Sequence, residues 1–435
     1  MFILNYIYFA IVSVLGLKFL FQREGKVRSP FDKNKLLVFE GTELFILLVF
    51  STGLLAFSAV AGTFDLMAVR LFMLELFCVI GIYIADRKIG KNLPIALYVT
   101  YLLWLFVGLF YSPSASYGLR VILKYLYPFL IMLLASAVVR NEEVFLKAGL
   151  YARAVGVISL FVVLTDSDKL IQWESIIPGV FWYGTAAAIH YINMVVLSLA
   201  LYFYYGKNKM DLFWAGLFSL PCVLLGLRTS IMGLTLAIGI FVLFRYKLKS
   251  LPLLMAILTV FISILLLAPE ARNKMFVNES ITTQEIMDGN ISMDAINSNG
   301  RFNMWEKLLD RMYAGKEITG SGTGSTQNYL YNNNVFGGLK VPHNDYVQQL
   351  CDNGLVGIVL YLTMCLLVII HCFKEFNNRK NIHAVRVSAI IAGAALGGTI
   401  LTMLTDNVVN YSMATLAYPF GFYGMMLGLK KGQEK

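Results

Sequence analysis

One histidine stands where its chemistry could serve a reaction. His343 precedes a long apolar run in the stretch PHNDYVQQLCDN, and the chain has four histidines in all. An imidazole titrates near neutral pH, so it can take a proton from a hydroxyl nucleophile. A histidine in such a place is more often a capping or packing residue than a base. The residues around it are needed to choose between these two interpretations.

Four cationic side chains, three beside apolar segments and one in the long loop, are candidates for contact with a substrate. Arg120 and Lys124 are four residues apart, which places them on one helix face. Arg228 lies between two apolar runs in LLGLRTSIMGL, and Arg301 lies in NGRFNMW. A charge next to a membrane segment is costly and marks a functional site by default. The alternative for Arg120 and Lys124 is a role as interfacial anchors.

Glycines of the same region permit positive φ angles and close backbone approach. The candidates among them are Gly300, Gly320, Gly322 and Gly324. The run TGSGTGS is not a nucleotide P-loop, because it neither follows a strand nor ends in Gly-Lys-Ser/Thr. On its own, a Gly/Ser run of this kind is more often a flexible turn than a ligand cradle.

Metal and disulfide chemistry find little support in the sequence. We find no compact cluster of His, Asp and Glu, so we expect a metal-independent protein without a cofactor. The five cysteines form no CxxC pair, which argues against both zinc and a disulfide framework.

Composition indicates that the elements holding these residues are membrane helices. Of the 435 residues, 58% are hydrophobic and only 14% are charged, far fewer than in a soluble domain. The apolar residues come in continuous blocks of membrane-spanning length, so we expect helices and not the alternating strands of a barrel. We predict an all-α polytopic fold with about 13 crossings, in a range of about 12 to 14. The predicted helices span residues 2–21, 37–62, 68–85, 93–111, 121–139, 148–164, 183–205, 212–227, 229–244, 251–268, 354–373, 387–405 and 409–429.

Charge alternates along the connections between these helices. Every second connection, ending with the C-terminal tail, is basic, and together this set holds 22 Lys and Arg against 6 Asp and Glu. The long loop 269–353 holds 7 basic and 10 acidic residues. By the positive-inside rule, the loop is extracytoplasmic and the C-terminus cytoplasmic, in the cell inner membrane. The net charge of +10 is therefore an orientation signal and a partner for membrane lipid, and we expect no nucleic acid partner.

The predicted organisation is a single membrane domain in three parts. Within the loop, Met304, Leu308 and Met312 recur at helical spacing and predict a short helix. Glu75 and Arg153 lie inside apolar segments, where pairing within the bundle or snorkelling is the alternative to a direct role. The three parts are an N-terminal helix bundle at 1–268, the extracytoplasmic loop at 269–353 and C-terminal helices at 354–435.

Three stretches in chain order resemble the O-antigen ligase and Wzy-type polysaccharide polymerase superfamily. They are an Arg at the outer end of a Thr/Ser-rich helix, a Gly-Arg-x-x-x-Trp stretch, and a Gly-x-Gly run followed by His-Asn-x-Tyr and a Gly-containing helix start. The resemblance covers roughly residues 225–360 and departs from the family at Asn299, where a Ser is often found. The residues that carry it are Arg228, Thr229, Ser230, Gly300, Arg301, Trp305, Gly322, Gly324, His343, Asn344, Tyr346, Gly354 and Gly357.

The resemblance implies a glycan on undecaprenyl diphosphate as the substrate, and glycosyl transfer outside the cytoplasmic membrane. A diphosphate leaving group needs cationic, bidentate donors, and Arg suits this better than Lys. Arg228 and Arg301 come first for this role, and Arg120 and Lys124 follow. His343 would be the base for the acceptor hydroxyl. The residues expected to contact the glycan are Trp305, Tyr346, Asn344 and Tyr329.

Three functions stay open at this point. The first is a polymerase of lipid-linked repeat units for O-antigen, capsule or exopolysaccharide, and the second is a ligase that moves finished glycan to another acceptor. The third is a transporter or flippase for the lipid-linked glycan. A transporter of this kind often contains inverted repeats, and none is visible in this sequence. Other assembly proteins, such as a flippase or a chain-length regulator, are expected partners.

Overall fold

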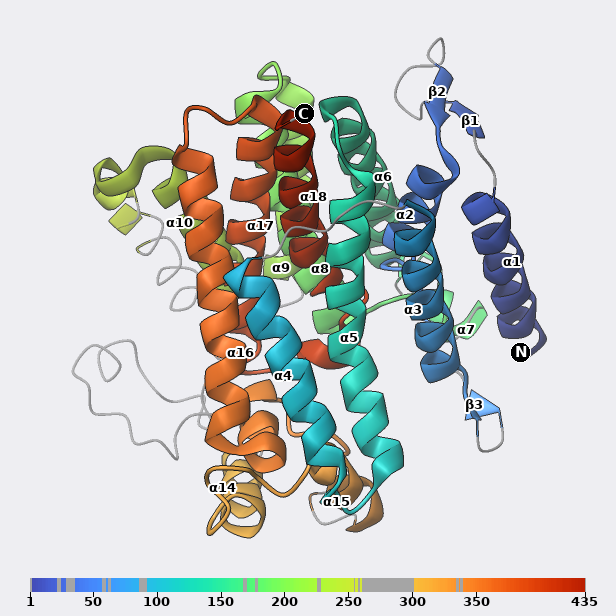
Figure 1. The fold of residues 1–435 in the computed structure, drawn as a ribbon, viewed down its shortest axis with the longest axis vertical. Coiled ribbons are helices and arrows are strands. Elements are labelled where there is room, and N and C mark those ends of the chain that lie inside the picture. The colour runs from blue at the N-terminus through green and yellow to red at the C-terminus, as the bar shows by residue number, and fades with distance from the viewer. Residues whose placement is uncertain are drawn as a thin grey trace.

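The computed structural model is a bundle of α-helices, most of which run roughly along its long axis (Figure 1). It describes residues 2–21, 25–28, 36–56, 60–61, 64–85, 92–166, 170–176, 179–224, 228–253, 301–333 and 339–434, together with 255, 256, 259 and 336. The helices are α1 (Phe2–Phe21), α2 (Gly41–Ser51), α3 (Leu66–Ala85), α4 (Leu93–Leu109), α5 (Ala115–Val138), α6 (Glu142–Thr165), α7 (Trp173–Ile176), α8 (Gly184–Tyr204), α9 (Lys209–Leu224), α10 (Arg228–Tyr246), α14 (Arg301–Met312), α15 (Ser325–Asn333), α16 (Asp345–Asn377), α17 (His383–Thr402) and α18 (Ala417–Gln433). The 3-10 turns are η1 (Lys247–Ser250) and η3 (Val408–Tyr411).

Two small antiparallel hairpins accompany the helices. Strand β1 (Gly25–Arg28) pairs with β2 (Leu36–Phe39), and β3 (Val60–Ala61) pairs with β4 (Phe64–Asp65). Their register sets Gly25 opposite Phe39 and Val60 opposite Asp65.

Seven of the described helices are long and apolar enough to cross a membrane: α3, α5, α6, α8, α10, α16 and α17. Shorter apolar helices lie at Ala10–Phe21, Gly41–Ser51 and Leu93–Leu109. The polytopic helical architecture predicted from the apolar blocks is therefore present. The expected total of about 13 crossings stays a prediction, since most of the block at 251–268 lies outside the described residues.

Small residues let the central helices pack closely. α18 packs against α5 and α17, and α17 packs against α10. A Cβ atom at Gly424 of α18 would lie 2.1 Å from the carbonyl oxygen of Met132 in α5. At Gly398 of α17, a Cβ atom would lie 2.6 Å from the carbonyl oxygen of Gly233 in α10. Such close backbone approach is how membrane helices associate without a hydrophobic driving force.

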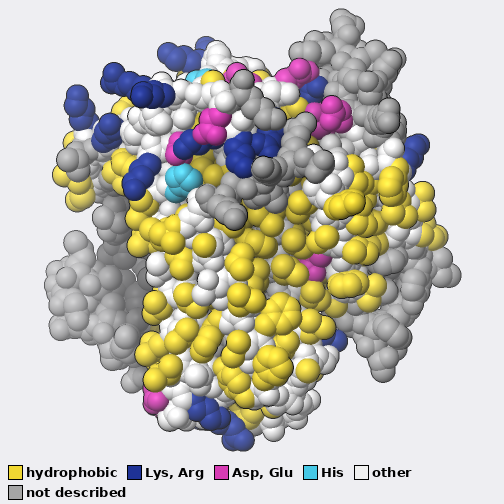
Figure 2. All heavy atoms as spheres, viewed as in Figure 1, with side chains coloured by type: hydrophobic (Ala, Val, Ile, Leu, Met, Phe, Trp, Pro, Cys, Tyr) yellow, Lys and Arg dark blue, Asp and Glu magenta, His cyan; other side chains and the backbone are white. Residues whose placement is uncertain are grey.

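The two ends of the bundle differ in charge and in structure. One end, here called the loop end, carries α14 and α15, and the opposite end carries the C-terminus (Figure 1). Figure 2 shows hydrophobic side chains across the middle of the molecule, with Lys and Arg gathered at the C-terminal end. This distribution is typical of a membrane protein with a cytoplasmic C-terminal end.

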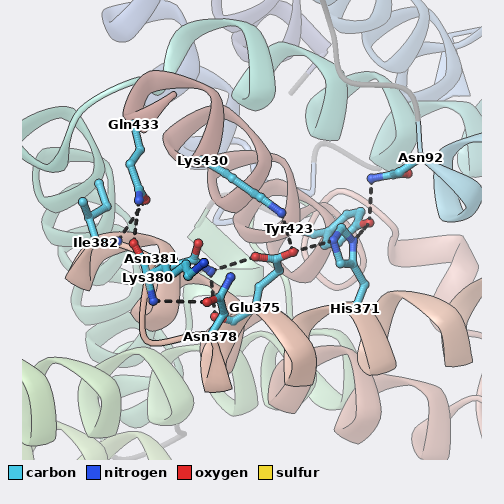
Figure 3. Close-up of polar contacts among 10 residues, drawn as sticks. All are labelled: Asn92, His371, Glu375, Asn378, Lys380, Asn381, Ile382, Tyr423, Lys430 and Gln433. Atoms are coloured by element: carbon cyan, nitrogen blue, oxygen red, sulfur yellow. Dashed lines mark hydrogen bonds and ion pairs between the residues drawn. The ribbon is translucent and has the colours of Figure 1, made fainter. Parts of the chain in front are cut away.

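A network of polar contacts joins α4, α16 and α18 at the C-terminal end (Figure 3). His371 of α16 lies between the hydroxyl of Tyr423 in α18, at 2.7 Å, and a Glu375 carboxylate oxygen, at 3.2 Å. Glu375 also accepts a hydrogen bond from Lys430 of α18 at 2.6 Å. Asn92, at the start of α4, donates to Tyr423 at 3.1 Å. These polar side chains bond to one another, so they join the ends of the helices. Their charges are kept away from the apolar middle of the bundle.

Charged residues inside the bundle have distinct surroundings. Arg153 of α6 forms an ion pair with Asp211 of α9, which agrees with the pairing expected inside the bundle. Arg70 of α3 donates from Nη1 to the carbonyl oxygen of Leu55 at 2.7 Å. Glu75 of α3 is buried, and its carboxylate has no hydrogen-bond partner among the residues that the structure describes.

Two predicted helices have different bounds. The helix expected at 37–62 ends at Ser51, because the backbone beyond it pairs with the segment before α8. The amide of Ala56 donates to the carbonyl of Val180 at 2.7 Å in this pairing. The helix expected at 409–429 begins only at Ala417, because residues 403–416 form a turn.

The expected boundary between the long loop and the C-terminal helices coincides with a break in α16. Gly354 has φ 64° and ψ −166°, so the helix that begins at Asp345 kinks there before it crosses the bundle. A Cβ atom at this position would lie 2.3 Å from the carbonyl oxygen of Ile318. Only glycine fits both the positive φ and this contact. Met304, Leu308 and Met312 are buried on one face of α14, as the helical spacing predicted.

Candidate active site

The turn between α17 and α18, residues 403–416, is the point where most candidate residues meet. It contains η3 and contacts the first residues of α14 and α16 from inside the bundle. Irregular backbone at membrane depth is tolerated where it is buried in protein or lines a cavity. Its contacts with five other parts of the chain are Lys124 Nζ to Asn410 Oδ1 (2.6 Å), Gln327 Nε2 to Asn410 Oδ1 (3.4 Å), Arg301 Nη1 to the Thr405 carbonyl (3.0 Å), Thr229 Oγ1 to Thr405 Oγ1 (2.7 Å) and the Val409 amide to Asp345 Oδ2 (3.1 Å).

His343 faces a carboxylate across this turn. Its Nδ1 lies 3.4 Å from Oδ1 of Asp406. The His343 side chain keeps 23% of its exposure, whereas that of Asp406 keeps 10%, so the ring and not the carboxylate is accessible to a ligand. Hydrogen bonds of catalytic groups are often long in ligand-free proteins and shorten when the substrate binds. This arrangement leaves Nε2 as the nitrogen that can accept a proton.

The segment around His343 is fixed on both sides. The indole Nε1 of Trp305 donates to the carbonyl of Pro342 at 2.6 Å, and Asn344 Oδ1 caps α16 by accepting from the Tyr346 and Val347 amides. His343 itself has φ 52°, a left-handed conformation that is uncommon for a residue with a Cβ. The flanking contacts hold this conformation, and residues held in this way cluster at functional sites.

Asp406 stays ionised in spite of its burial. Burial opposes the charged form, but hydrogen bonds from His343, Thr185 and the Asn407 amide outweigh it, so the pKa of Asp406 is lowered. The hydrogen bond from the Asn407 amide nitrogen to Asp406 Oδ1 is 2.7 Å long. An ionised carboxylate beside Nδ1 favours the tautomer with the proton on Nδ1, which keeps Nε2 basic.

Arg301 and Arg228 come to the same turn from different directions. Arg301 is the first residue of α14, and its Nη1 donates to the carbonyl of Thr405. α10 begins at Arg228, and the next residue, Thr229, is bonded to Thr405. The Arg228 side chain and the whole of Gly300 lie outside the described residues.

A cavity of about 380 Å³ lies beside the turn. Its size is in the range of ligand-binding pockets. Its lining includes two cations of α5, Arg120 and Lys124. It also includes the apolar side chains of Ala56, Met67, Ala68, Leu71, Phe181 and Met413. The other lining residues are Tyr117, Leu123, Trp182, Tyr183, Ala186, Gln327, Tyr331, Val341, Asn410, Tyr411 and Ser412.

Two short segments of the chain connect the cavity with the His343–Asp406 pair. Val341 lines the cavity two residues before His343. Thr185, which bonds to Asp406, stands between Tyr183 and Ala186, and both of these line the cavity. The cavity and the His343–Asp406 pair therefore share the segments around Val341 and Thr185.

The predicted glycine run serves the architecture of the loop. The Asp352 carboxylate of α16 accepts bonds from the amides of Gly324 and Thr326 and from the hydroxyls of Ser325 and Thr326, at 2.6–3.0 Å. These amides are therefore not available to a phosphate. A Cβ atom at Gly322 would lie 2.5 Å from Ser112, and one at Gly320 would lie 2.6 Å from the Asn353 amide. These close contacts hold the loop against the connection between α4 and α5 and against α16.

The aromatic residues expected to bind glycan have other contacts. Trp305 holds the segment before His343, and the hydroxyl of Tyr346 donates to the Ile400 carbonyl at 2.7 Å. The Tyr329 ring lies beneath the guanidinium of Arg311, whose Cζ is 4.6 Å from the ring centre. None of the three lines the cavity. A role for them as glycan contacts stays a prediction.

Several residues of the site were not anticipated from the sequence. Asp406, Asn410 and Gln327 are polar residues without a motif, and Tyr117 and Tyr331 are two of 24 tyrosines. One signal was available: the run Thr-Asp-Asn interrupts two apolar blocks on the same predicted side of the membrane as the long loop. Among the residues that the structure describes, no group of three His, Cys, Asp or Glu side chains could hold a metal ion.

Fold and site together define a polytopic helical membrane protein with a cationic cavity and a histidine–carboxylate pair at one end. A family model described as O-antigen ligase matches residues 215–362, about a third of the chain. This match supports the resemblance of the segment to the O-antigen ligase and Wzy-type superfamily that its motifs indicate. It also supports an enzyme of the ligase or polymerase type. No curated protein matches the chain.

The matched segment contains only part of the site. It includes Arg301 and His343, whereas Arg120, Lys124 and Asp406 lie outside it. The structure places the two sets together, because the 403–416 turn touches residues of both.

Proposed function

We propose that this chain transfers a glycan from undecaprenyl diphosphate to an acceptor hydroxyl at the loop end. The acceptor in this proposal is a second lipid-linked repeat unit, so the reaction polymerises repeat units into a surface polysaccharide. The alternative is an O-antigen-type ligase that moves finished glycan to a different acceptor. The family match supports this alternative equally well, because both reactions use the same kind of donor.

The observation that supports the proposal most strongly is the composition of the cavity. A cationic pair, Arg120 and Lys124, and several apolar side chains line one cavity of about 380 Å³. A polyprenyl diphosphate combines the same two properties, an anionic head and an apolar chain. Cations bind the diphosphate, and the apolar side chains accept the first isoprene units of the lipid.

The reaction follows from the placement of His343 next to this cavity. The acceptor hydroxyl oxygen forms a bond to the anomeric carbon of the donor sugar, and the bond from that carbon to the diphosphate oxygen breaks. His343 Nε2 takes the proton of the hydroxyl, and Asp406 holds Nδ1 and stabilises the resulting imidazolium. Arg120 and Lys124, with Arg301 and Arg228 as further candidates, stabilise the departing diphosphate, so we propose that no metal ion is required.

The proposed location is the inner membrane of the cell, with the loop end outside and the C-terminus in the cytoplasm. The gathering of Lys and Arg at the C-terminal end in Figure 2 supports this orientation. A flippase that delivers the lipid-linked glycan to the loop end and a chain-length regulator are the proposed partners.

The glycan profile of a deletion strain separates the two candidate reactions. Loss of a polymerase leaves single repeat units on the lipid carrier. Loss of a ligase leaves long polymer that is not attached to its final acceptor. A profile identical to that of the parent strain would contradict both.

A further inference from the structure

Two tyrosines at the cavity, Tyr117 of α5 and Tyr331 of α15, form an aromatic pair that the proposed reaction has not used. Their ring centres are 5.6 Å apart, with 31° between the planes. Both residues line the cavity, and Tyr331 is 47% exposed. A buried aromatic residue packs its faces against protein, whereas this pair leaves ring surface that a ligand can cover.

The pair lies directly beside the cations of the cavity. The Arg120 guanidinium carbon is 5.6 Å from the centre of the Tyr117 ring, and Lys340 Nζ is 5.9 Å from that of Tyr331. In a lipid-linked glycan, the first sugar is joined to the diphosphate through a single oxygen. A diphosphate held by Arg120 therefore places its sugar next to these rings.

The surroundings of the pair suit a neutral, hydroxyl-rich ligand. Gln327 stands four residues before Tyr331, so α15 presents both side chains to the cavity on one face. Gln327 and Asn410 offer amide groups for sugar hydroxyls, and no Asp or Glu is found among the described residues of the lining. The aromatic faces would cover the C–H bonds of a pyranose ring.

The Tyr331 ring can contact a ligand because it is not needed to hold α15, which other contacts fix in place. Four hydrogen bonds that the Asp352 carboxylate accepts hold the first turn of α15. Leu330, the neighbour of Tyr331, is buried in the small apolar cluster with α14, which anchors the helix from its other side. Removal of the Tyr331 ring should therefore leave the position of α15 unchanged.

We propose that Tyr117 and Tyr331 form a sugar subsite that stacks on the first, diphosphate-linked sugar of the donor. The inference rests on the proposed function and adds to it the binding of a carbohydrate face. The sugar subsite helps determine which donor is accepted, because a pyranose with polar groups on both faces would stack poorly.

The test compares two lipids in purified protein: glycan-bearing polyprenyl diphosphate and the same polyprenyl diphosphate without glycan. Tyr331→Leu and Tyr117→Leu should weaken binding of the glycan-bearing lipid about tenfold, as expected for one lost stacking contact. Their binding of the glycan-free lipid should stay within about twofold of the wild type. Tyr331→Phe, which keeps the ring, should bind both lipids normally.

Tyr111→Leu is the matched control, since Tyr111 is 41% exposed at the same end and does not line the cavity. Equal weakening for both lipids would overturn the inference, because the rings would then contact the diphosphate or the lipid chain. Unchanged binding in both leucine variants would also overturn it. A wild-type protein that binds neither lipid would instead contradict the proposed function itself.

Discussion

At the scale of single residues, His343 could be singled out from the sequence whereas its partner could not. His343 stands in a motif, but Asp406 lies 63 residues further along the chain in a polar run that resembles an ordinary turn. Only the fold brings the two together. Arg301 can also be singled out from its motif, yet its bond to the Thr405 carbonyl follows from packing that no local pattern encodes.

Asp406→Asn should reduce the transfer rate at least about tenfold at neutral pH and leave donor binding unchanged. The amide cannot stabilise the imidazolium that forms when His343 takes a proton. Measured kcat should fall while KM for the donor stays constant. A weaker donor affinity with an unchanged kcat would show that Asp406 contacts the donor and does not position His343.

The difference in stability between the wild type and Asp406→Asn should depend on pH. The pKa of Asp406 is lowered below its ordinary value of 3.8, so its contribution to stability is fully present above 3.8. This contribution is lost as the pH falls through the lowered pKa. The difference in unfolding temperature between wild type and Asp406→Asn should therefore be constant near neutral pH and shrink below 3.8. A difference that grows with acidification would contradict the assignment.

Arg120→Gln and Lys124→Gln should each weaken binding of glycan-free polyprenyl diphosphate by roughly 10- to 100-fold, since a charge-assisted contact of about 1.5–3 kcal/mol is lost. Arg311→Gln is the control, because Arg311 is a loop cation that stacks on Tyr329 away from the cavity. Binding in a lipid-containing disc measures the effect. Equal affinity in the two cavity variants and the control would remove the cavity as the donor site.

At the scale of elements, the apolar blocks were sufficient to locate most helices but not to fix where each helix begins and ends. The spacing of Met304, Leu308 and Met312 predicted α14 because one face of that helix must be buried. The predicted helices leave a break at 406–408, but the extension of this turn to residue 416 was missed because the run from Val409 was taken as helical. Tertiary bonds break the helix there: Asp345 accepts from the Val409 amide, and Thr415 donates to the Val408 carbonyl.

The glycine run was expected near the ligand, and the structure gives it a tight place against α5. Gly324 has φ 83°, and a Cβ atom there would lie 2.4 Å from the Gly118 amide nitrogen. Gly315 has φ 75° with nothing within 4 Å of its Cβ position. Gly324→Ala should therefore destabilise the protein by at least about 2 kcal/mol, whereas Gly315→Ala should cost only about 1 kcal/mol. Thermal unfolding in detergent measures both, and equal losses would contradict the clamping role of the run.

At the scale of the whole molecule, the charge alternation of the connections predicts which end faces outward. All five cysteines are buried, so a single introduced thiol can report the orientation. Ala314→Cys, exposed at the loop end, should react with a membrane-impermeant maleimide in intact cells. Glu434→Cys, at the C-terminal end, should react only after the membrane is opened. The reverse pattern would invert the proposed topology.

The most direct test of the central claim is transfer by the purified protein in lipid vesicles supplied with lipid-linked repeat units. We predict longer or relocated glycan together with release of free polyprenyl diphosphate, unaffected by EDTA, and loss of both in His343→Ala by at least about 100-fold with donor binding retained. Wild-type protein that binds the donor but releases no polyprenyl diphosphate would contradict the claim. So would a His343→Ala variant that transfers glycan at the wild-type rate.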